Sequence, residues 1–303
     1  MSFQSDPLPC RPQPDEGRIP HANKMLAFRA LQIGLKYSFQ NWRMWSNYAM
    51  VGVDLGENTE ACRALTRVVE ERADVDGEGC IDIEVLDRLV ASVTRAPSPG
   101  SAEERALEEQ HEQDGVQIAF TSNHGKGLET YVTRLIEQTI LPRISSSARI
   151  YKAHAKLLLW RGRVADALDA HVKAYRASVV NDDEVERERV RWREAVEEVQ
   201  EVVDMLVGLG PRAVDDEQTR LKAASPAEGQ ETKLVWKDWK FQARSIVRSF
   251  MGASYACSLA LSRVCGCRLT VCLSARTGRT KDSFEDEPEW DRLKEALDEI
   301  KNA

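Results

Sequence analysis

The sequence predicts an all-α protein in which helical hairpins stack into an α-solenoid. Three observations support this fold class. Apolar residues recur at helical spacing along most of the chain after residue 24, which is typical of amphipathic helices. No run of residues alternates between apolar and polar as a half-buried strand does. One order of aromatic, alanine and glycine residues occurs twice at the same spacing, as a repeated hairpin requires.

The composition excludes several classes of protein. The 303 residues include 42 basic and 49 acidic side chains, a net charge of −7, and 42% are hydrophobic. Charges of both signs are interleaved, so we expect no direct contact with nucleic acid. No run of about 18 apolar residues occurs, so we expect no membrane span. The cysteines number seven, and an odd number indicates free thiols in a reducing compartment. The expected location is the cytoplasm, with the nucleus as a second compartment.

Residues 1–24 are predicted to form a disordered tail because their prolines prevent a helix. Residues 25–181 are the predicted repeat region. Its first hairpin lies around Trp45, which Ala49 follows after four residues, Gly56 after eleven and Ala61 after sixteen. Trp45 and Ala49 would lie on the inner face of the first helix, and Gly56 would end that helix in a left-handed conformation. Ala61 is small enough to let the second helix pack closely.

The same order recurs around Tyr151, with Ala155, Gly162 and Ala167 at the same offsets. Ala27 precedes Ala61 by 34 residues, so residues 24–37 are predicted to be the second helix of a repeat whose first helix is missing. An unrelated helical bundle with coincidental spacing is the alternative. The predicted packing residues of the two hairpins are Trp42, Trp45, Tyr48, Ala49, Gly56, Ala61, Tyr151, Ala155, Gly162 and Ala167.

This spacing resembles the tetratricopeptide repeat, and several runs resemble the tetratricopeptide repeat protein 27 family. The runs are Ala30–Tyr48, Val53–Glu57, Trp239–Gly252, Arg279–Ser283 and Glu287–Trp290. Fungal members of that family are described as essential for maintenance of the cell wall. The resemblance implies a non-enzymatic adaptor in the chaperone-linked assembly of large complexes, through Hsp90 and towards spliceosomal particles. It covers only the C-terminal portion of a longer family chain, so a shortened product without stable function is one alternative.

The rest of the chain is predicted to be helical with three interruptions. Residues 81–95 form an amphipathic helix, an acidic loop is inserted at 96–127, and another helix covers 128–141. Residues 182–252 hold the C-terminal helices, the first of which should begin at an Asp182 or Asp183 cap and end at Gly210 and Pro211. A linker follows at 211–232, and a last helix at 279–303. Residues 253–278, which hold four cysteines and no acidic residue, are predicted to be a non-native insert.

The long helix of that region carries a short apolar seam. Two heptads are too few for a coiled-coil prediction, so we expect packing on the last repeat and a monomer rather than a dimer. The residues of the seam are Trp192, Val196, Val199, Val203 and Leu206.

No cluster of residues predicts catalysis, a cofactor or a metal site. Gly125-Lys126-Gly127 lacks the earlier glycine of a phosphate loop and is expected to be a solvated loop. The cysteines of residues 253–278 lack the paired spacing of zinc ligands. His154 and His171 fall at packing positions, where hydrogen-bonded core histidines are expected. An enzyme that uses dispersed Cys and His residues is the alternative from another class.

The candidate binding site is the concave face formed by the first helices of the hairpins. Residues three, four or seven positions apart share one face of a helix, and two such sets are present. We expect this face to hold extended acidic segments of other proteins, Hsp90-type chaperone tails among them. A solvated basic face without a partner is the alternative. The candidate residues are Arg43, Asn47 and Met50 in the first hairpin and Arg149, Lys152 and Lys156 in the second.

Overall fold

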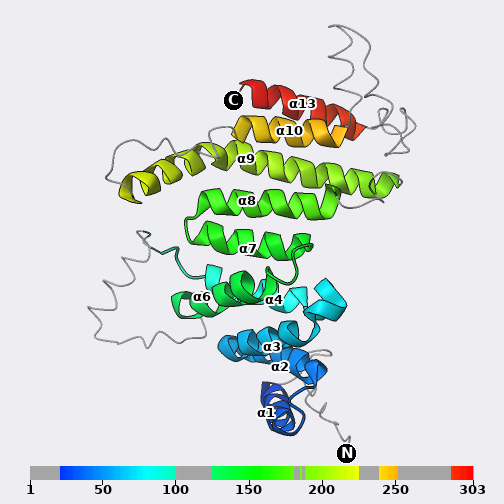
Figure 1. The fold of residues 1–303 in the computed structure, drawn as a ribbon, viewed down its shortest axis with the longest axis vertical. Coiled ribbons are helices and arrows are strands. Elements are labelled where there is room, and N and C mark those ends of the chain that lie inside the picture. The colour runs from blue at the N-terminus through cyan, green and yellow to red at the C-terminus, as the bar shows by residue number, and fades with distance from the viewer. Residues whose placement is uncertain are drawn as a thin grey trace, which may run out of the picture.

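Figure 1 shows the computed structural model as an elongated stack of helices, with α1 (His21–Tyr37) at one end and α13 (Pro288–Asn302) at the other. The structure describes residues 21–99, 101, 125–180, 185, 188–224, 239–251 and 288–302. These residues contain helices and no strand, so the predicted all-α class is confirmed. No helix among them is long and apolar enough to cross a membrane. The predicted insert at 253–278 and nearly all of the proline-rich tail lie outside the described residues.

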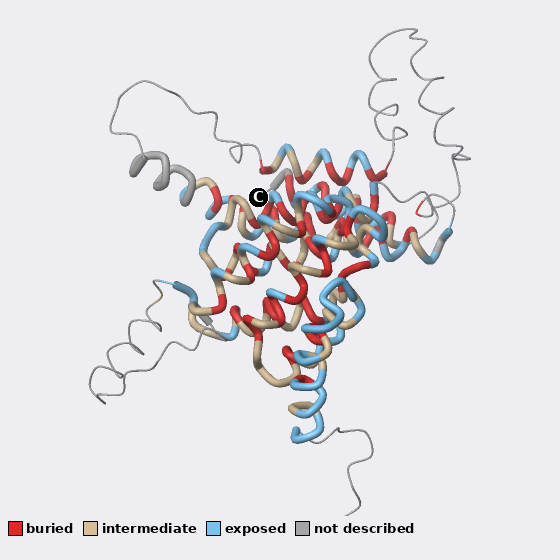
Figure 2. Tube along the Cα trace, turned by 60° about the horizontal axis from the view of Figure 1, so that its bottom comes forward, coloured by how far each residue is buried: buried red, intermediate tan, exposed pale blue. Residues whose placement is uncertain are grey.

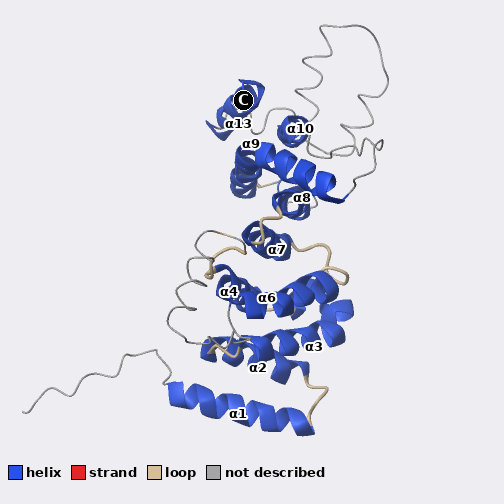
Figure 3. Ribbon diagram, turned by 90° about the vertical axis from the view of Figure 1, so that its left-hand side faces the viewer, coloured by secondary structure: helices blue, strands red, loops and turns tan. Residues whose placement is uncertain are grey.

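The first two-thirds of the stack form two layers. In Figure 3, α2 and α4 lie on one side and α3 and α6 on the other. Within the first layer, α4 contacts both α2 and α7. Within the second layer, α3 contacts α6. The helices are α2 (Trp42–Leu55), α3 (Asn58–Asp76), α4 (Ile83–Thr94), α6 (Gly125–Thr133), α7 (Ala148–Trp160) and α8 (Val164–Tyr175). A short 3-10 turn, η1 (Gly77–Cys80), follows α3, and π-helical turns η2 (Arg134–Ile140) and η3 (Arg176–Val180) extend α6 and α8.

Both predicted hairpins form, and the predicted glycines end their first helices. Gly56 has a φ of 81° and Gly162 a φ of 74°, the left-handed region that favours glycine. The Gly56 amide donates to the Val53 carbonyl at 3.1 Å, and the next amide donates to the Gly52 carbonyl at 2.9 Å. Gly162 and the residue after it make the equivalent two bonds. This is a Schellman motif, and it turns the chain from α2 into α3 and from α7 into α8.

The small residues of the pattern also lie where the spacing places them. Ala49, Ala61, Ala155 and Ala167 have no exposed surface. A Cβ atom added at Gly52 would lie 3.5 Å from the Cβ atom of Ala61, so α2 and α3 cross at close range. The small side chains therefore set the distance between the two helices of each hairpin.

The aromatic residue at the start of the pattern is less buried than expected. Trp45 is half-buried, and its indole N–H donates to the Phe39 carbonyl at 2.7 Å. Tyr48 takes the interior position instead, 3% exposed and stacked on Phe28 with ring centroids 4.4 Å apart. Burial, with the nearby carboxylate of Glu60, raises the pKa of the Tyr48 hydroxyl to about 12, so this hydroxyl is neutral at physiological pH.

A third hairpin lies between the two predicted ones. The predicted helix at 81–95 is α4, and its apolar residues Val85, Leu89 and Val93 are buried. It pairs with α6, although residues 95–124 separate the two helices in the sequence. The glycine–lysine–glycine run at 125–127 begins α6 and is not a loop, so that prediction was wrong. The remainder of the predicted acidic loop, apart from residues 96–99 and 101, lies outside the described residues.

The C-terminal part is built on α9 (Arg189–Ala224), which packs on α8 and on α10 (Trp239–Met251). The helix was expected to end at Gly210, but it continues through Pro211 into the segment predicted as a linker. A Cβ atom added at Gly210 would lie 2.6 Å from Trp239. Gly210 therefore serves the close approach of α10 rather than a helix end, and tertiary packing overrides the propensity of the Gly-Pro pair. At the other end of the chain, α1 begins at His21, within the predicted tail.

The apolar seam of α9 packs against other helices of the same chain. All five of its residues are buried in a core that α8, α10 and α13 complete. Trp192 stacks on Phe250 of α10 and on Trp290 of α13, with ring centroids 6.0 and 6.4 Å apart. Figure 2 shows buried residues through the middle of the stack and mostly exposed ones on α1 at its end. The described residues on either side of the predicted insert thus contribute to one core.

Candidate functional site

The predicted binding residues of the first hairpin lie on one exposed face of α2. Arg43, Asn47 and Met50 are exposed. Asp54 continues the same face four residues after Met50 and is half-buried. The guanidinium of Arg43 lies 5.2 Å from the ring of Trp42, within cation–π range. This end of the face therefore combines an exposed amide, a thioether and a cation.

Asp54 joins three helices. The Lys24 ammonium of α1 donates to its carboxylate at 2.6 Å, and the Arg88 guanidinium of α4 contacts it at 2.7 Å. The hydrogen bond from Lys24 and the contact with Arg88 hold the pKa of Asp54 below its usual value. The carboxylate is thus charged at physiological pH and links α1, α2 and α4.

The predicted binding residues of the second hairpin lie together on α7, but two of them already contact acidic side chains. The Lys152 ammonium is 2.9 Å from the Glu201 carboxylate of α9, and the Lys156 ammonium is 3.8 Å from the Asp87 carboxylate of α4. Arg149 is exposed and makes no ion pair with any residue that the structure describes. Lys156 is nevertheless exposed, whereas Lys152 is half-buried.

The helix α4 connects the two predicted sets. Its consecutive residues Asp87 and Arg88 reach in opposite directions, to Lys156 of α7 and to Asp54 of α2. We call this line of ion pairs the charged row; it consists of Lys24, Asp54, Arg88, Asp87, Lys156, Lys152 and Glu201. The pairs are partly exposed, so each contributes about 0–1 kcal/mol to stability.

Sequence reasoning found Lys152 and Lys156 of the charged row and missed Lys24, Arg88 and the three acids. Asp54 could have been found, because it continues the Arg43–Asn47–Met50 spacing. Asp87, Arg88 and Glu201 gave no such signal, since their role depends on which helix lies beside theirs.

His171 of α8 is 4% exposed, and neither ring nitrogen has a hydrogen-bond partner among the described residues. Burial lowers the pKa of His171, so the ring is neutral at physiological pH. The charged groups that affect it are Glu201, Lys152 and Lys156. The predicted core position is confirmed, but within the described ranges His171 does not make the predicted hydrogen bond.

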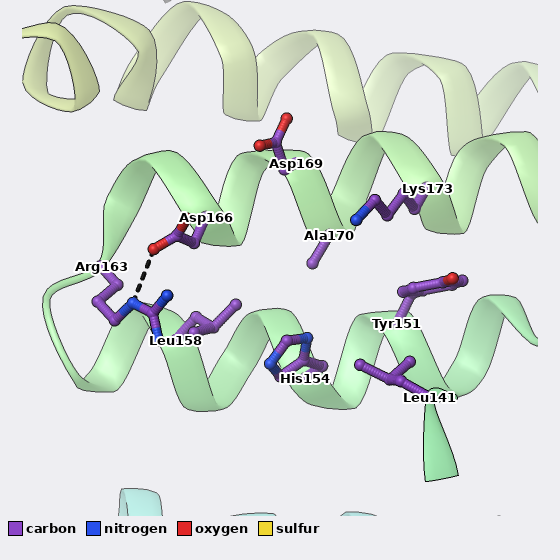
Figure 4. Close-up of a pocket in the computed structure, with 9 residues that line it drawn as sticks. All are labelled: Leu141, Tyr151, His154, Leu158, Arg163, Asp166, Asp169, Ala170 and Lys173. Carbon is purple, nitrogen blue, oxygen red and sulfur yellow. Dashed lines mark hydrogen bonds and ion pairs between the residues drawn. The ribbon is translucent and has the colours of Figure 1, made fainter. Parts of the chain in front are cut away.

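A pocket of about 160 Å³ lies between α7 and α8 (Figure 4). Tyr151 and His154 of α7 face Ala170 and Lys173 of α8 across it. His154 Nε2 is 3.2 Å from a Glu137 carboxylate oxygen, and burial lowers the pKa of this histidine as well. At one end of the pocket the Arg163 guanidinium donates to the Asp166 carboxylate at 2.7 Å.

That pocket contains none of the six predicted binding residues. Its lining charges are of both signs, and its histidine is held by Glu137. Of the predicted packing residues, Tyr151 lies at its edge and is only half-buried.

The described residues provide no reactive thiol and no metal site. Burial raises the pKa of the Cys62 thiol to about 12 and also raises that of Cys80, whereas a nucleophilic cysteine needs a lowered pKa. Within the described ranges no group of three or more His, Cys, Asp or Glu side chains could hold a metal ion. The other five cysteines of the sequence lie outside those ranges.

The chain is similar to tetratricopeptide-repeat proteins of other organisms. It is 29% identical over 229 residues to a TPR repeat-containing protein of Schizosaccharomyces pombe, a match that covers 76% of this chain and 23% of that protein. It is 27% identical over 263 residues to "Essential for maintenance of the cell wall protein 1" of Saccharomyces cerevisiae, covering 86% of this chain and 22% of that one. A tetratricopeptide repeat-containing protein of Caenorhabditis elegans is 31% identical over 96 residues, 32% of this chain and 12% of that protein.

The resemblance predicted from the sequence is thereby confirmed. The chain spans less than a quarter of the length of the two fungal relatives. No family model matches the chain, and no solved structure matches it.

Proposed function

We propose that this chain is a non-enzymatic protein-interaction scaffold that holds extended segments of partner proteins along the face shared by α2, α4 and α7. The similarity to tetratricopeptide-repeat proteins supports this role. The observation that most directly supports the proposal is the charged row, because its ion pairs link α2 through α4 to α7, the two outer helices being those that carry the predicted binding residues. Stacked helical repeats use such continuous surfaces to bind extended chains.

The preferred partner segment is acidic. Arg43 and Arg149 are exposed cations on this face, and Lys152 and Lys156 add two more. Carboxylates of the bound segment would replace Glu201 in its ion pair with Lys152 and Asp87 in its ion pair with Lys156. Exposed ion pairs are weak, so the exchange costs little. The proposed segments include the acidic tails of Hsp90-type chaperones. Binding of these tails would give the chain a role in the chaperone-linked assembly of large complexes, in the cytoplasm and the nucleus.

The test is a titration of a fluorescein-labelled peptide of mixed Asp and Glu residues against the 303-residue chain. Replacing Lys152 and Lys156 with Glu would set like charges against Glu201 and Asp87 inside the protein, so neutral variants are needed. The double variant Lys152→Gln, Lys156→Gln should bind the peptide with an affinity roughly two- to tenfold lower. This is the effect expected from the loss of two exposed ion pairs. Asp87→Asn with Glu201→Gln removes the internal competitors and should tighten binding.

Two controls accompany this titration. A peptide of the same length made of Asn and Gln should bind no variant, and Arg248→Gln, which alters an exposed cation on α10, should leave binding unchanged. Binding should weaken as salt rises, because the Debye length falls to about 8 Å at physiological ionic strength. Equal affinity of the parent and both double variants for the acidic peptide would refute the proposal.

A further inference from the structure

His171 of α8 is a buried side chain whose hydrogen-bonding capacity is unused in the free chain. It is 4% exposed, and within the described residues neither of its ring nitrogens has a partner. Buried polar side chains are nearly always hydrogen-bonded, so an exception of this kind needs an explanation. An apolar side chain of similar size would avoid the cost of an unsatisfied nitrogen. The imidazole therefore lowers the stability of the free chain, as polar groups at functional sites often do.

The charged groups that act on His171 belong to the charged row. Figure 1 shows α8 between α7 and α9, and α8 packs against both helices. Of the groups that act on the ring, Lys152 and Lys156 come from α7, and Glu201 comes from α9. The described part of the chain in η3, which extends α8, contributes no such group. The ring is thus surrounded by the same side chains to which the proposed function assigns the binding of acidic segments.

In the free chain the balance of these charges opposes protonation of the ring. The Lys152 ammonium lies 2.9 Å from the Glu201 carboxylate, and this pair joins the two helices that flank α8. Lys152 and Lys156 repel a positive charge on the ring, while the only acid of the three is engaged by Lys152. Burial above all, and then the two lysines, lower the pKa of His171, and Glu201 offsets this only in part. The free chain therefore holds His171 in its neutral form at physiological pH.

An acidic segment bound as proposed above would reverse this balance. Its carboxylates would neutralise Lys152 and Lys156 and so remove the repulsion of a charged imidazole. Glu201, released from Lys152, would supply the hydrogen-bond acceptor that a protonated His171 lacks in the free chain. A nearby carboxylate and a hydrogen bond to the charged form both favour protonation. The pKa of His171 should therefore be higher in the complex than in the free chain.

We infer that the binding of an acidic segment to Lys152 and Lys156 is coupled to the uptake of a proton from solvent by His171. This inference rests on the proposed function and adds a pH dependence to it. Because the complex binds more protons than the free chain, the affinity for acidic segments rises as the pH falls through the range in which His171 titrates. By the same linkage, a bound acidic segment makes the ring easier to protonate.

The test is isothermal titration calorimetry of an unlabelled peptide of mixed Asp and Glu residues against the 303-residue chain. Between about pH 7.5 and 5.5 the peptide stays ionised, because the pKa values of its side chains lie near 4. The affinity of the parent should rise about three- to tenfold over this range, whereas that of His171→Leu should change by less than about twofold. Titrations in buffers of different ionisation enthalpy at about pH 6.5 should detect proton uptake by the parent and none by His171→Leu.

His154 provides a matched control. It is also a histidine whose pKa is lowered by burial, but its ring lies 3.2 Å from Glu137, and neither lysine of the charged row acts on it. His154→Gln should therefore retain the pH dependence of the parent. Circular dichroism at each pH checks that all three proteins are folded.

The free chain allows a second test that needs no peptide. Lys152→Gln removes a cation near the ring and frees Glu201, so it should raise the pKa of His171, as measured by NMR of isotope-labelled histidine side chains. Addition of Glu201→Gln should cancel that rise. Arg248→Gln, which alters an exposed cation on α10, should leave the pKa of His171 unchanged.

The outcomes separate this inference from the proposed function. Three results would overturn the inference while leaving the proposed function intact: peptide binding that is independent of pH, an equal pH dependence in the parent and His171→Leu, or no rise in the pKa of His171 in Lys152→Gln. Absence of peptide binding at every pH would refute the proposed function and, with it, the coupling.

Discussion

Replacing Ala61 with leucine tests the hairpin assignment most directly. Ala61 has no exposed surface, and a Cβ atom at Gly52 would lie only 3.5 Å from its own. The three extra carbons of leucine would run into the backbone of α2 where the two helices cross. Overpacking of this kind costs about 1–3 kcal/mol, and we expect Ala61→Leu to lower the free energy of unfolding by an amount in that range.

The chain provides a matched control 34 residues earlier. Ala27 holds the same place in α1 that Ala61 holds in α3, but it is exposed. Ala27→Leu adds the same atoms at a place where no other described helix would clash with them, so the change in stability should stay within about 0.5 kcal/mol. Urea unfolding of parent and both variants, followed by far-UV circular dichroism, measures the difference in midpoint. Equal midpoints for Ala61→Leu and Ala27→Leu would show that the crossing of α2 and α3 is not close, and the hairpin geometry would be wrong.

Three other substitutions or deletions have defined outcomes. Trp45→Ala should lower the free energy of unfolding in urea by about 2 kcal/mol, less than the 3–5 kcal/mol of a fully buried tryptophan, because Trp45 is half-buried; a loss of about 3 kcal/mol or more would place it in the interior. Deletion of residues 253–278 should leave the melting temperature unchanged or raised, and a fall of several degrees would show that this segment is part of the fold. Burial lowers the pKa of His171, so its contribution to stability is complete above the unfolded value of about 6.5 and declines as pH falls below it. The free energy of unfolding of His171→Leu should therefore fall less than that of the parent between about pH 7.5 and 5.5. An equal fall in both proteins would show that other groups cause the pH dependence.

The sequence was sufficient for features that depend on local spacing. The offsets from Trp45 and Tyr151 located two hairpins, and Gly56 and Gly162 located their turns, because a left-handed residue at a helix end is a local requirement. The hairpin of α4 and α6 was not predicted, because residues 95–124 separate its two helices and the spacing typical of the repeat is therefore lost. The C-terminal end of α9 was also not predictable from local spacing. The helix continues through Pro211, and Gly210 packs against Trp239 of α10, a contact between distant residues.

The candidate site was predictable in position but not in its charge balance. A helix face can be read from i, i+3 and i+7 spacing, and this placed Arg149, Lys152 and Lys156 together. Whether a lysine on that face is free depends on the acids of neighbouring helices. Glu201 lies 45 residues or more from each of them in the sequence, and its proximity to Lys152 follows only from the packing of α9 beside α7 and α8.

The proposed exchange of ion-pair partners in the charged row requires that the loss of an internal pair does not unfold the protein, and the distribution of buried residues meets this requirement. The helices are held by two large apolar cores, one through α1 to α7 and one through α8 to α13. Burial of a single leucine or isoleucine contributes about 1.5–3 kcal/mol, whereas each pair in the charged row contributes about 0–1 kcal/mol. Loss of the Lys152–Glu201 or Lys156–Asp87 pair therefore leaves the stack intact. In the proposed complex, a partner's carboxylates would replace Glu201 and Asp87 at little cost, and the affinity for that partner would depend on how many such replacements one extended segment makes at once.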